Sequence, residues 1–106
     1  MEWETLLTGT KWEILELLSE KKYSPMELAK RLNTTIANIS QQLRLLQTAG
    51  IVTREKTATA GAGKPRTLFS ISHDFGFISI ITDGFAGKKL IKLAPEQKRL
   101  LKQWIK

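Results

Sequence analysis

Two helix signals separated by a very short turn, in the first half of the chain, limit the fold more than any other feature. Ser24 and Pro25 suit the N-cap and first position of a helix, and Glu27 completes a capping box. Asn33 suits the left-handed turn at a helix end. Thr34 or Thr35 can cap the next helix at once. The pattern therefore predicts two helices joined by a tight turn.

The second of these helices is expected at about residues 35–49. Its apolar side chains recur every three or four residues and predict one buried stripe, in which Ile36 and Ile39 belong to the core: Ile36, Ile39, Leu43, Leu46 and Ala49. The remaining face is polar and contains no acidic residue. Gly50 suits the C-terminal cap.

Further helices are predicted on either side of this pair. Residues 11–20 have helical apolar spacing, with Thr10 as N-cap and Glu13 three residues later. Residues 1–7 are expected to add a helical turn. Pro95 is expected to open a last helix that ends near Ile105.

Strand-like runs at residues 51–57 and 66–72 flank a stretch of small residues and glycines at 58–65, which predicts a hairpin with a flexible tip. Residues 77–82 and 88–93 also resemble strands, with Asp83-Gly84 and Gly87 as turn signals. The sequence leaves open whether residues 75–93 complete the first hairpin's sheet, form a second hairpin or cover a ligand.

Charge favours a polyanionic partner, because the net charge is +7 and the pI is about 9.9. Residues 21–70 carry nine bases and two acids, whereas residues 1–20 carry five acids and one base. The chain has no cysteine, which excludes disulfides and thiolate metal sites. Without a secretory signal pattern or a long apolar run, we expect a soluble, cytoplasmic protein with no membrane partner.

A family resemblance follows from two segments, LNTTIANISQQL at 32–43 and LQTAGIV at 46–52. They resemble the winged helix-turn-helix of ArsR-type and MarR-like prokaryotic transcription regulators, bacterial and archaeal, over about residues 10–72. The resemblance implies an α+β fold with a three-helix core and a β-hairpin wing. It also implies a cytoplasmic, usually dimeric regulator without enzymatic activity. Residues 73–106 then form a strand and helix extension of one domain spanning 1–106.

The resemblance does not extend to metal sensing, because His73 is the only histidine and no cysteine is present. We therefore expect no metal site of the ArsR type and no cofactor. The sequence identifies no small-molecule effector.

Two groups of side chains are predicted to contact double-stranded DNA. Outward residues of the helix at 35–49 are expected to contact base edges, with Asn38 or Gln41 suited to adenine and Ala37 to a thymine methyl. Basic residues of the hairpin are expected on phosphate or in the minor groove. The predicted set is Thr35, Ala37, Asn38, Ser40, Gln41, Arg44, Arg54, Lys56, Lys64 and Arg66.

Several alternatives accompany this hypothesis. The domain is expected to form a homodimer through residues 3–7 and 96–105, but it could instead be a protein-interaction or RNA-binding winged helix. Gly61-Ala62-Gly63-Lys64 lacks the full spacing of a phosphate-binding loop. His73 and Asp74 have no nucleophile beside them, which disfavours catalysis.

Overall fold

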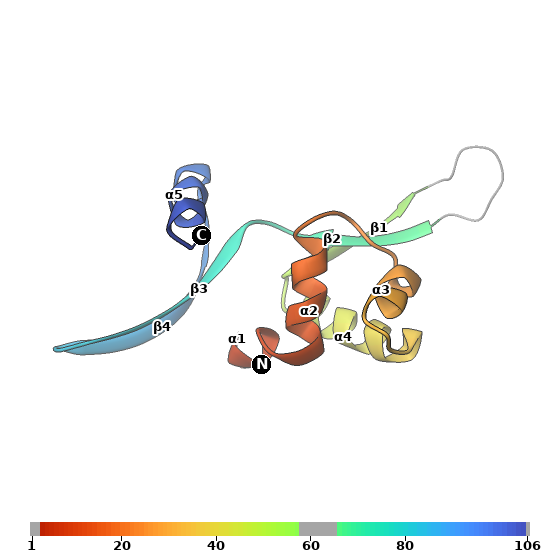
Figure 1. The fold of residues 1–106 in the computed structure, drawn as a ribbon, viewed down its shortest axis with the longest axis horizontal. Helices are drawn as coiled ribbons and strands as arrows, with labels where there is room; N and C mark the ends of the chain where they lie inside the picture. Colours follow the sequence, from red (N-terminus) through yellow and green to blue (C-terminus); the bar gives the residue numbers. More distant parts are fainter. Residues whose placement is uncertain (1–2, 58–65, 106) are drawn as a thin grey trace. The chain divides into compact units, whose positions relative to one another are not determined.

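The chain divides into two compact units, Met1–Ser72 and His73–Lys106, in a computed structural model that describes residues 3–57 and 66–105 (Figure 1). The first unit contains α1 (Trp3–Leu6), α2 (Gly9–Leu18), α3 (Pro25–Arg31), α4 (Ile36–Thr48), β1 (Val52–Thr57) and β2 (Arg66–Ile71). The second contains β3 (Phe75–Thr82), β4 (Phe85–Lys92) and α5 (Pro95–Ile105). In the described part of the chain, no helix is long and apolar enough to span a membrane.

The hydrophobic core of the first unit lies between α2, α3, α4 and the β1–β2 hairpin. Ile14, Leu28, Ile39 and Leu46 are fully shielded from solvent. Tyr23, Val52 and Phe69 extend this core to the hairpin, and the other buried members are Leu15, Leu18, Ala29, Leu43 and Ile51. Apolar burial is the main favourable term in folding, so this core fixes the positions of α4 and the hairpin.

The helix-turn-helix forms as its capping residues predict. Ser24 accepts a hydrogen bond from the Glu27 amide at 3.2 Å, and the Glu27 carboxylate accepts one from the Ser24 amide at 3.0 Å. Asn33 has a φ of 53° after α3, and Gly50 has a φ of 79° after α4. Thr35 caps α4 by accepting a hydrogen bond from the Asn38 amide at 3.0 Å.

Two predictions for the helices are wrong. Helix α2 begins at Gly9 and has Thr8 as N-cap, because the Trp12 amide already donates to the Thr8 carbonyl, so Thr10 lies inside the helix. Ile36 is not in the core, since 47% of the residue is exposed. It is the first residue of α4, one turn before Ile39, where the buried part of the helix begins.

The β1–β2 hairpin confirms the predicted wing. Its antiparallel register runs from Val52 opposite Ile71 to Thr57 opposite Arg66. Tyr23 adds a short antiparallel bridge to Phe69, with backbone hydrogen bonds of 3.2 and 2.8 Å. The bridge joins the start of the helix-turn-helix to the wing. The predicted tip at 58–65 lies outside the described residues.

The second unit is a separate hairpin followed by a helix. Strands β3 and β4 pair only with each other among the described residues, so of the alternatives that the sequence left open for residues 75–93, the structure has the second hairpin and not an extended wing sheet. Asp83 and Gly84 form the turn, with a φ of 120° at Gly84. Gly87, predicted as a turn, lies within β4 opposite Ile80.

Candidate nucleic-acid interface

Helix α4 presents one fully exposed side. Ala37, Gln41, Arg44 and Thr48 are all exposed, and intervals of four, three and four residues place them on one side of the helix. The opposite side carries the buried Ile39, Leu43 and Leu46. Because α4 contains no acidic residue, this exposed side has no carboxylate to repel a polyanion.

A groove separates α4 from the wing and brings predicted residues from both elements together. It is lined by Pro25, Ser40, Leu43, Arg44, Gln47, Arg54, Thr67 and Phe69. Arg44 from α4 and Arg54 from β1 therefore lie along the same hollow. In the hairpin, Arg54 pairs with Phe69 and Lys56 pairs with Thr67. Because side chains alternate between the two faces of a strand, Lys56 lies on the same face of the wing as Arg54.

The cations Arg44, Arg54 and Lys56 are exposed and have no ion-pair partner among the residues that the structure describes. Their charge is available to an external anion. Two of them line the groove and Lys56 lies on the same face of the wing as Arg54, an arrangement that suits the closely spaced phosphates of a nucleic acid.

Arg66 has a different environment from these three cations. Its Nη2 lies 2.7 Å from Oε1 of Glu27, which ties the wing to the start of α3. The backbone hydrogen bond from Ser24 lowers the pKa of Glu27, and Arg66 adds a smaller contribution in the same direction. Lys64, its predicted companion, lies outside the described residues.

Asn38 and Thr35 are held in a hydrogen-bond network at the start of α4. The Asn38 side chain donates to Thr34 Oγ1 at 3.1 Å and accepts from Gln42 Nε2 at 3.2 Å. Asn38 is half-buried, and Thr35 uses its hydroxyl as the helix cap. These hydrogen bonds fix the orientation of the Asn38 amide and use one of its two donors and one of its two acceptor positions.

Two polar residues of the groove were not among the predicted DNA contacts, namely Gln47 and Thr67. Gln47 follows Ser40 by seven residues, a spacing that keeps both on one side of a helix, so periodicity contains a signal for it. Thr67 lies beside Arg66 in the wing, and only the strand register shows that it belongs with Arg54 and Phe69.

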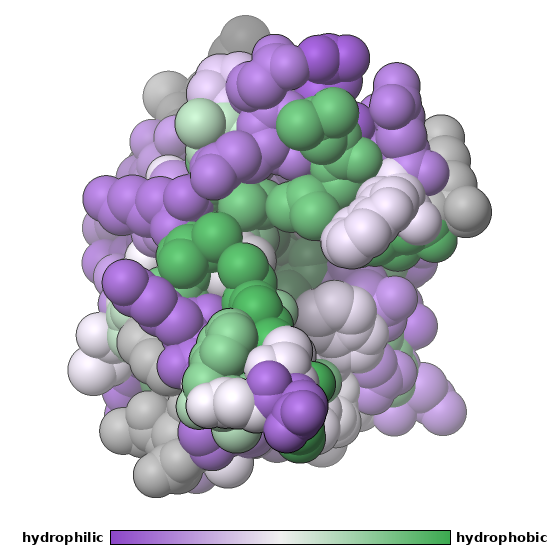
Figure 2. Space-filling view, turned by 90° about the vertical axis from the view of Figure 1, so that its left-hand side faces the viewer, coloured by the Kyte–Doolittle hydropathy of each residue, from purple (hydrophilic) through white to green (hydrophobic). Residues whose placement is uncertain are grey.

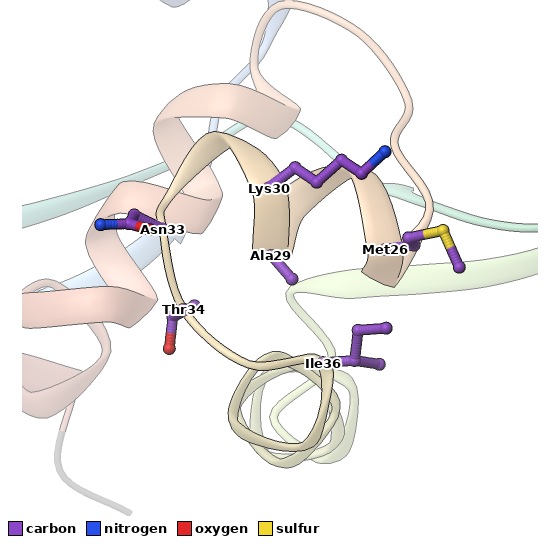
Figure 3. Close-up of a pocket in the computed structure, with 6 residues that line it drawn as sticks. All are labelled: Met26, Ala29, Lys30, Asn33, Thr34 and Ile36. Carbon is purple, nitrogen blue, oxygen red and sulfur yellow. The ribbon is translucent and has the colours of Figure 1, made fainter.

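A second hollow lies between α3 and the start of α4 (Figure 3). It is lined by Met26, Ala29, Lys30, Asn33, Thr34 and Ile36. Met26 is 56% exposed and Ile36 is 47% exposed, so two large apolar side chains meet solvent here. Neither residue was predicted to contact DNA.

His73 and Asp74 each contact a different neighbour. The His73 ring meets Phe75 edge-on at 6.2 Å between centroids, and Asp74 lies 3.4 Å from Lys98. Within 3–57 and 66–105, no group of three or more His, Cys, Asp or Glu side chains is arranged to hold a metal ion.

Two helices joined by a tight turn, a following hairpin and a basic groove between them define a winged helix-turn-helix protein. Residues 8–54 match the family described as bacterial regulatory protein, arsR family. This segment is thus similar to the helix-turn-helix of that family, and the chain is a DNA-binding transcription regulator. The match covers just under half of the chain and ends within β1. No curated protein matches the chain in sequence.

One solved structure supports the fold. A ferric uptake regulator from Francisella tularensis, solved with iron, is similar at 22% identity and a TM-score of 0.50. The similarity covers 99% of this chain and 81% of that protein. A structure described as prokaryotic transcription factors covers 93% of this chain and 80% of its own, at 22% identity and a TM-score of 0.46.

Proposed function

We propose that this regulator binds duplex DNA with α4 in the major groove and the wing on the flanking backbone. The observation that carries the proposal is the groove in which Arg44 and Arg54 lie between an acid-free helix and the hairpin. An α-helix fits the major groove, and a basic hairpin beside it is suited to phosphate.

The roles of the side chains follow from their exposure. Gln41 and Ala37 lie on the exposed side near the start of α4, where base edges come closest in this mode of docking. Arg44 and Arg54 supply charge along the groove, and Ser40 lines the same hollow. Lys56 adds charge on the same face of the wing as Arg54. Thr35 and Asn38 chiefly fix the start of the helix. Arg66 and Lys64 remain proposed backbone contacts, with Arg66 held by Glu27.

A binding titration tests this arrangement. Selection from random duplexes supplies a preferred sequence, and fluorescence anisotropy then measures Kd between about 50 and 200 mM salt. Arg54→Ala is expected to weaken binding to all sequences and to reduce the slope of log K against log salt by about 1. Gln41→Ala is expected to change the selected sequence at one position.

Lys11→Ala in α2 serves as the charge-matched control and should leave the salt slope unchanged. Absence of duplex binding at about 50 mM salt contradicts the proposal. Preference for structured RNA over duplex DNA in a competition assay would establish the RNA-binding alternative instead.

The second unit supports a homodimer as the binding form. Its described residues include none that is buried, yet Ile81, Phe85, Trp104 and Ile105 are 86%, 62%, 85% and 82% exposed. Figure 2, which views the molecule from the left-hand side of Figure 1, shows hydrophobic residues at the surface. A two-stranded hairpin is marginal alone in water, because it buries little apolar surface, and both its strands have an unpaired edge that can pair with another chain. A second copy supplies further strands and covers these side chains.

The predicted interface of residues 3–7 and 96–105 is enlarged in this proposal by β3 and β4. We further place the protein in the cytoplasm, where a regulator meets DNA, and assign it no enzymatic activity, in keeping with the regulator family that residues 8–54 match.

A further inference from the structure

Met26 and Ile36 form an exposed apolar pair that the protein's own core does not use. Met26 comes from the start of α3 and Ile36 from the start of α4, and both line the hollow in Figure 3. Ala29, buried at 5% exposure, lines the hollow between them. Isolated exposed apolar residues are ordinary on protein surfaces, but these two adjoin the same hollow.

The position of Ile36 limits what can cover it. It is the first residue of α4, between the cap Thr35 and the exposed Ala37, both of which belong to the predicted DNA surface. Residues at the start of a recognition helix approach base edges first. The surroundings suit a polyanion, since Lys30 is exposed at the same hollow and α4 has no acid.

The major groove presents one apolar group to such a residue. Its edges carry hydrogen-bond donors and acceptors, apart from the C5-methyl group of thymine. We infer that Ile36, with Met26 beside it, contacts a thymine C5-methyl group and sets a preference for thymine at that position. This inference rests on the proposed placement of α4 in the major groove.

Replacement of thymidine by deoxyuridine isolates this contact, because it removes the methyl group and keeps every hydrogen-bonding group of the base. Each thymidine of the duplex selected by the wild-type protein is replaced in turn, and Kd is measured by anisotropy. At one position in each half-site, the wild-type protein should lose about fourfold in affinity, the effect of one buried methyl group.

The Ile36→Ala variant should bind the thymine-containing duplex more weakly than the wild type does, by a similar factor. It should no longer distinguish thymine from uracil at that position. Ile36→Val retains branched methyl groups and should keep most of the discrimination. Gln41→Ala, on the same helix, is the matched control and should retain full sensitivity to the methyl group at the position assigned to Ile36. Circular dichroism checks that each variant is folded.

The inference is overturned if no thymine methyl affects wild-type binding, or if Ile36→Ala keeps the full sensitivity at every position. Either result leaves the proposed DNA-binding mode intact, because the duplex is still bound. Failure of that mode has a different signature, since selection then recovers no preferred duplex at all.

Discussion

Glu27 links local helix capping to the attachment of the wing. Its carboxylate accepts a hydrogen bond from the Ser24 amide and faces Arg66 at 2.7 Å. Both interactions favour the ionised form, and the hydrogen bond from Ser24 is the larger cause of its lowered pKa. A carboxyl whose pKa is lowered by folding stabilises the folded state above the unfolded pKa, and this stabilisation disappears as pH falls through the folded pKa.

The Glu27→Gln variant is therefore expected to be less stable than the wild type at neutral pH by about 0.5 kcal/mol, a small value because both side chains are partly exposed. Glutamine can still complete the capping box, so the loss reflects mainly charge. Below the ordinary glutamate value of 4.5, the difference should shrink toward zero. Urea unfolding followed by circular dichroism across this pH range measures it.

Glu16→Gln, the same change at an exposed position of α2, provides the control and should show little difference at any pH. A difference between Glu27→Gln and the wild type that stays constant down to acidic pH would contradict the role assigned to the charge.

Both helices of the helix-turn-helix end in the same way. After α3, the Asn33 and Thr34 amides donate to the Lys30 and Ala29 carbonyls. After α4, Gly50 and Ile51 donate to the Gln47 and Leu46 carbonyls at 2.9 and 3.0 Å. These are the paired hydrogen bonds of a Schellman motif, which requires a left-handed residue after the helix.

The ends of α3 and α4 were predictable because capping is local chemistry. Ser24, Thr35, Asn33 and Gly50 each act on backbone groups within a few residues, and the sequence contains all the partners. The exposure of Ile36 could not be predicted in this way. Periodicity gives the direction of a side chain on its helix, but not how far the neighbouring helices cover it. The Arg66–Glu27 pair was also beyond local patterns, since 39 residues separate its partners.

Gly50→Ala tests the left-handed end of α4. A Cβ at this position meets no atom within 4 Å, so steric contact contributes nothing and the cost comes from the φ of 79°. We expect the free energy of unfolding to fall by about 1 kcal/mol. Thermal or urea unfolding measures the change, and DNA affinity should weaken only as far as the folded fraction falls.

Gly87→Ala is the matched control, because Gly87 also has open space around it but does not have a positive φ. It should leave the stability of the first unit unchanged. Equal effects of the two substitutions would show that backbone conformation is not the cause.

At the scale of the whole molecule, the two units differ in how far they bury their apolar side chains. Every described residue that is buried belongs to the first unit, whereas α5 and the β3–β4 hairpin have none. A segment of about this size rarely supplies enough core for a stable fold of its own, and association is one common remedy. Sequence patterns predicted α5 but not this exposure. An amphipathic helix has the same pattern whether its apolar side packs against its own chain or against another chain.

The double variant Ile81→Lys, Phe85→Lys is expected to convert the proposed dimer to a monomer. Lysines at two exposed positions beside the hairpin turn would place like charges within the proposed interface, where desolvating them is costly. Sedimentation equilibrium at micromolar concentration measures the mass. The monomer should still bind a single half-site, because Arg44 and Arg54 belong to the first unit, but it should lose the additional affinity for two half-sites on one duplex. Met26→Lys, at a comparably exposed apolar residue of the first unit, should remain dimeric. A wild-type protein that sediments as a monomer, or a double variant that stays dimeric, would show that the hairpin is not the dimer interface.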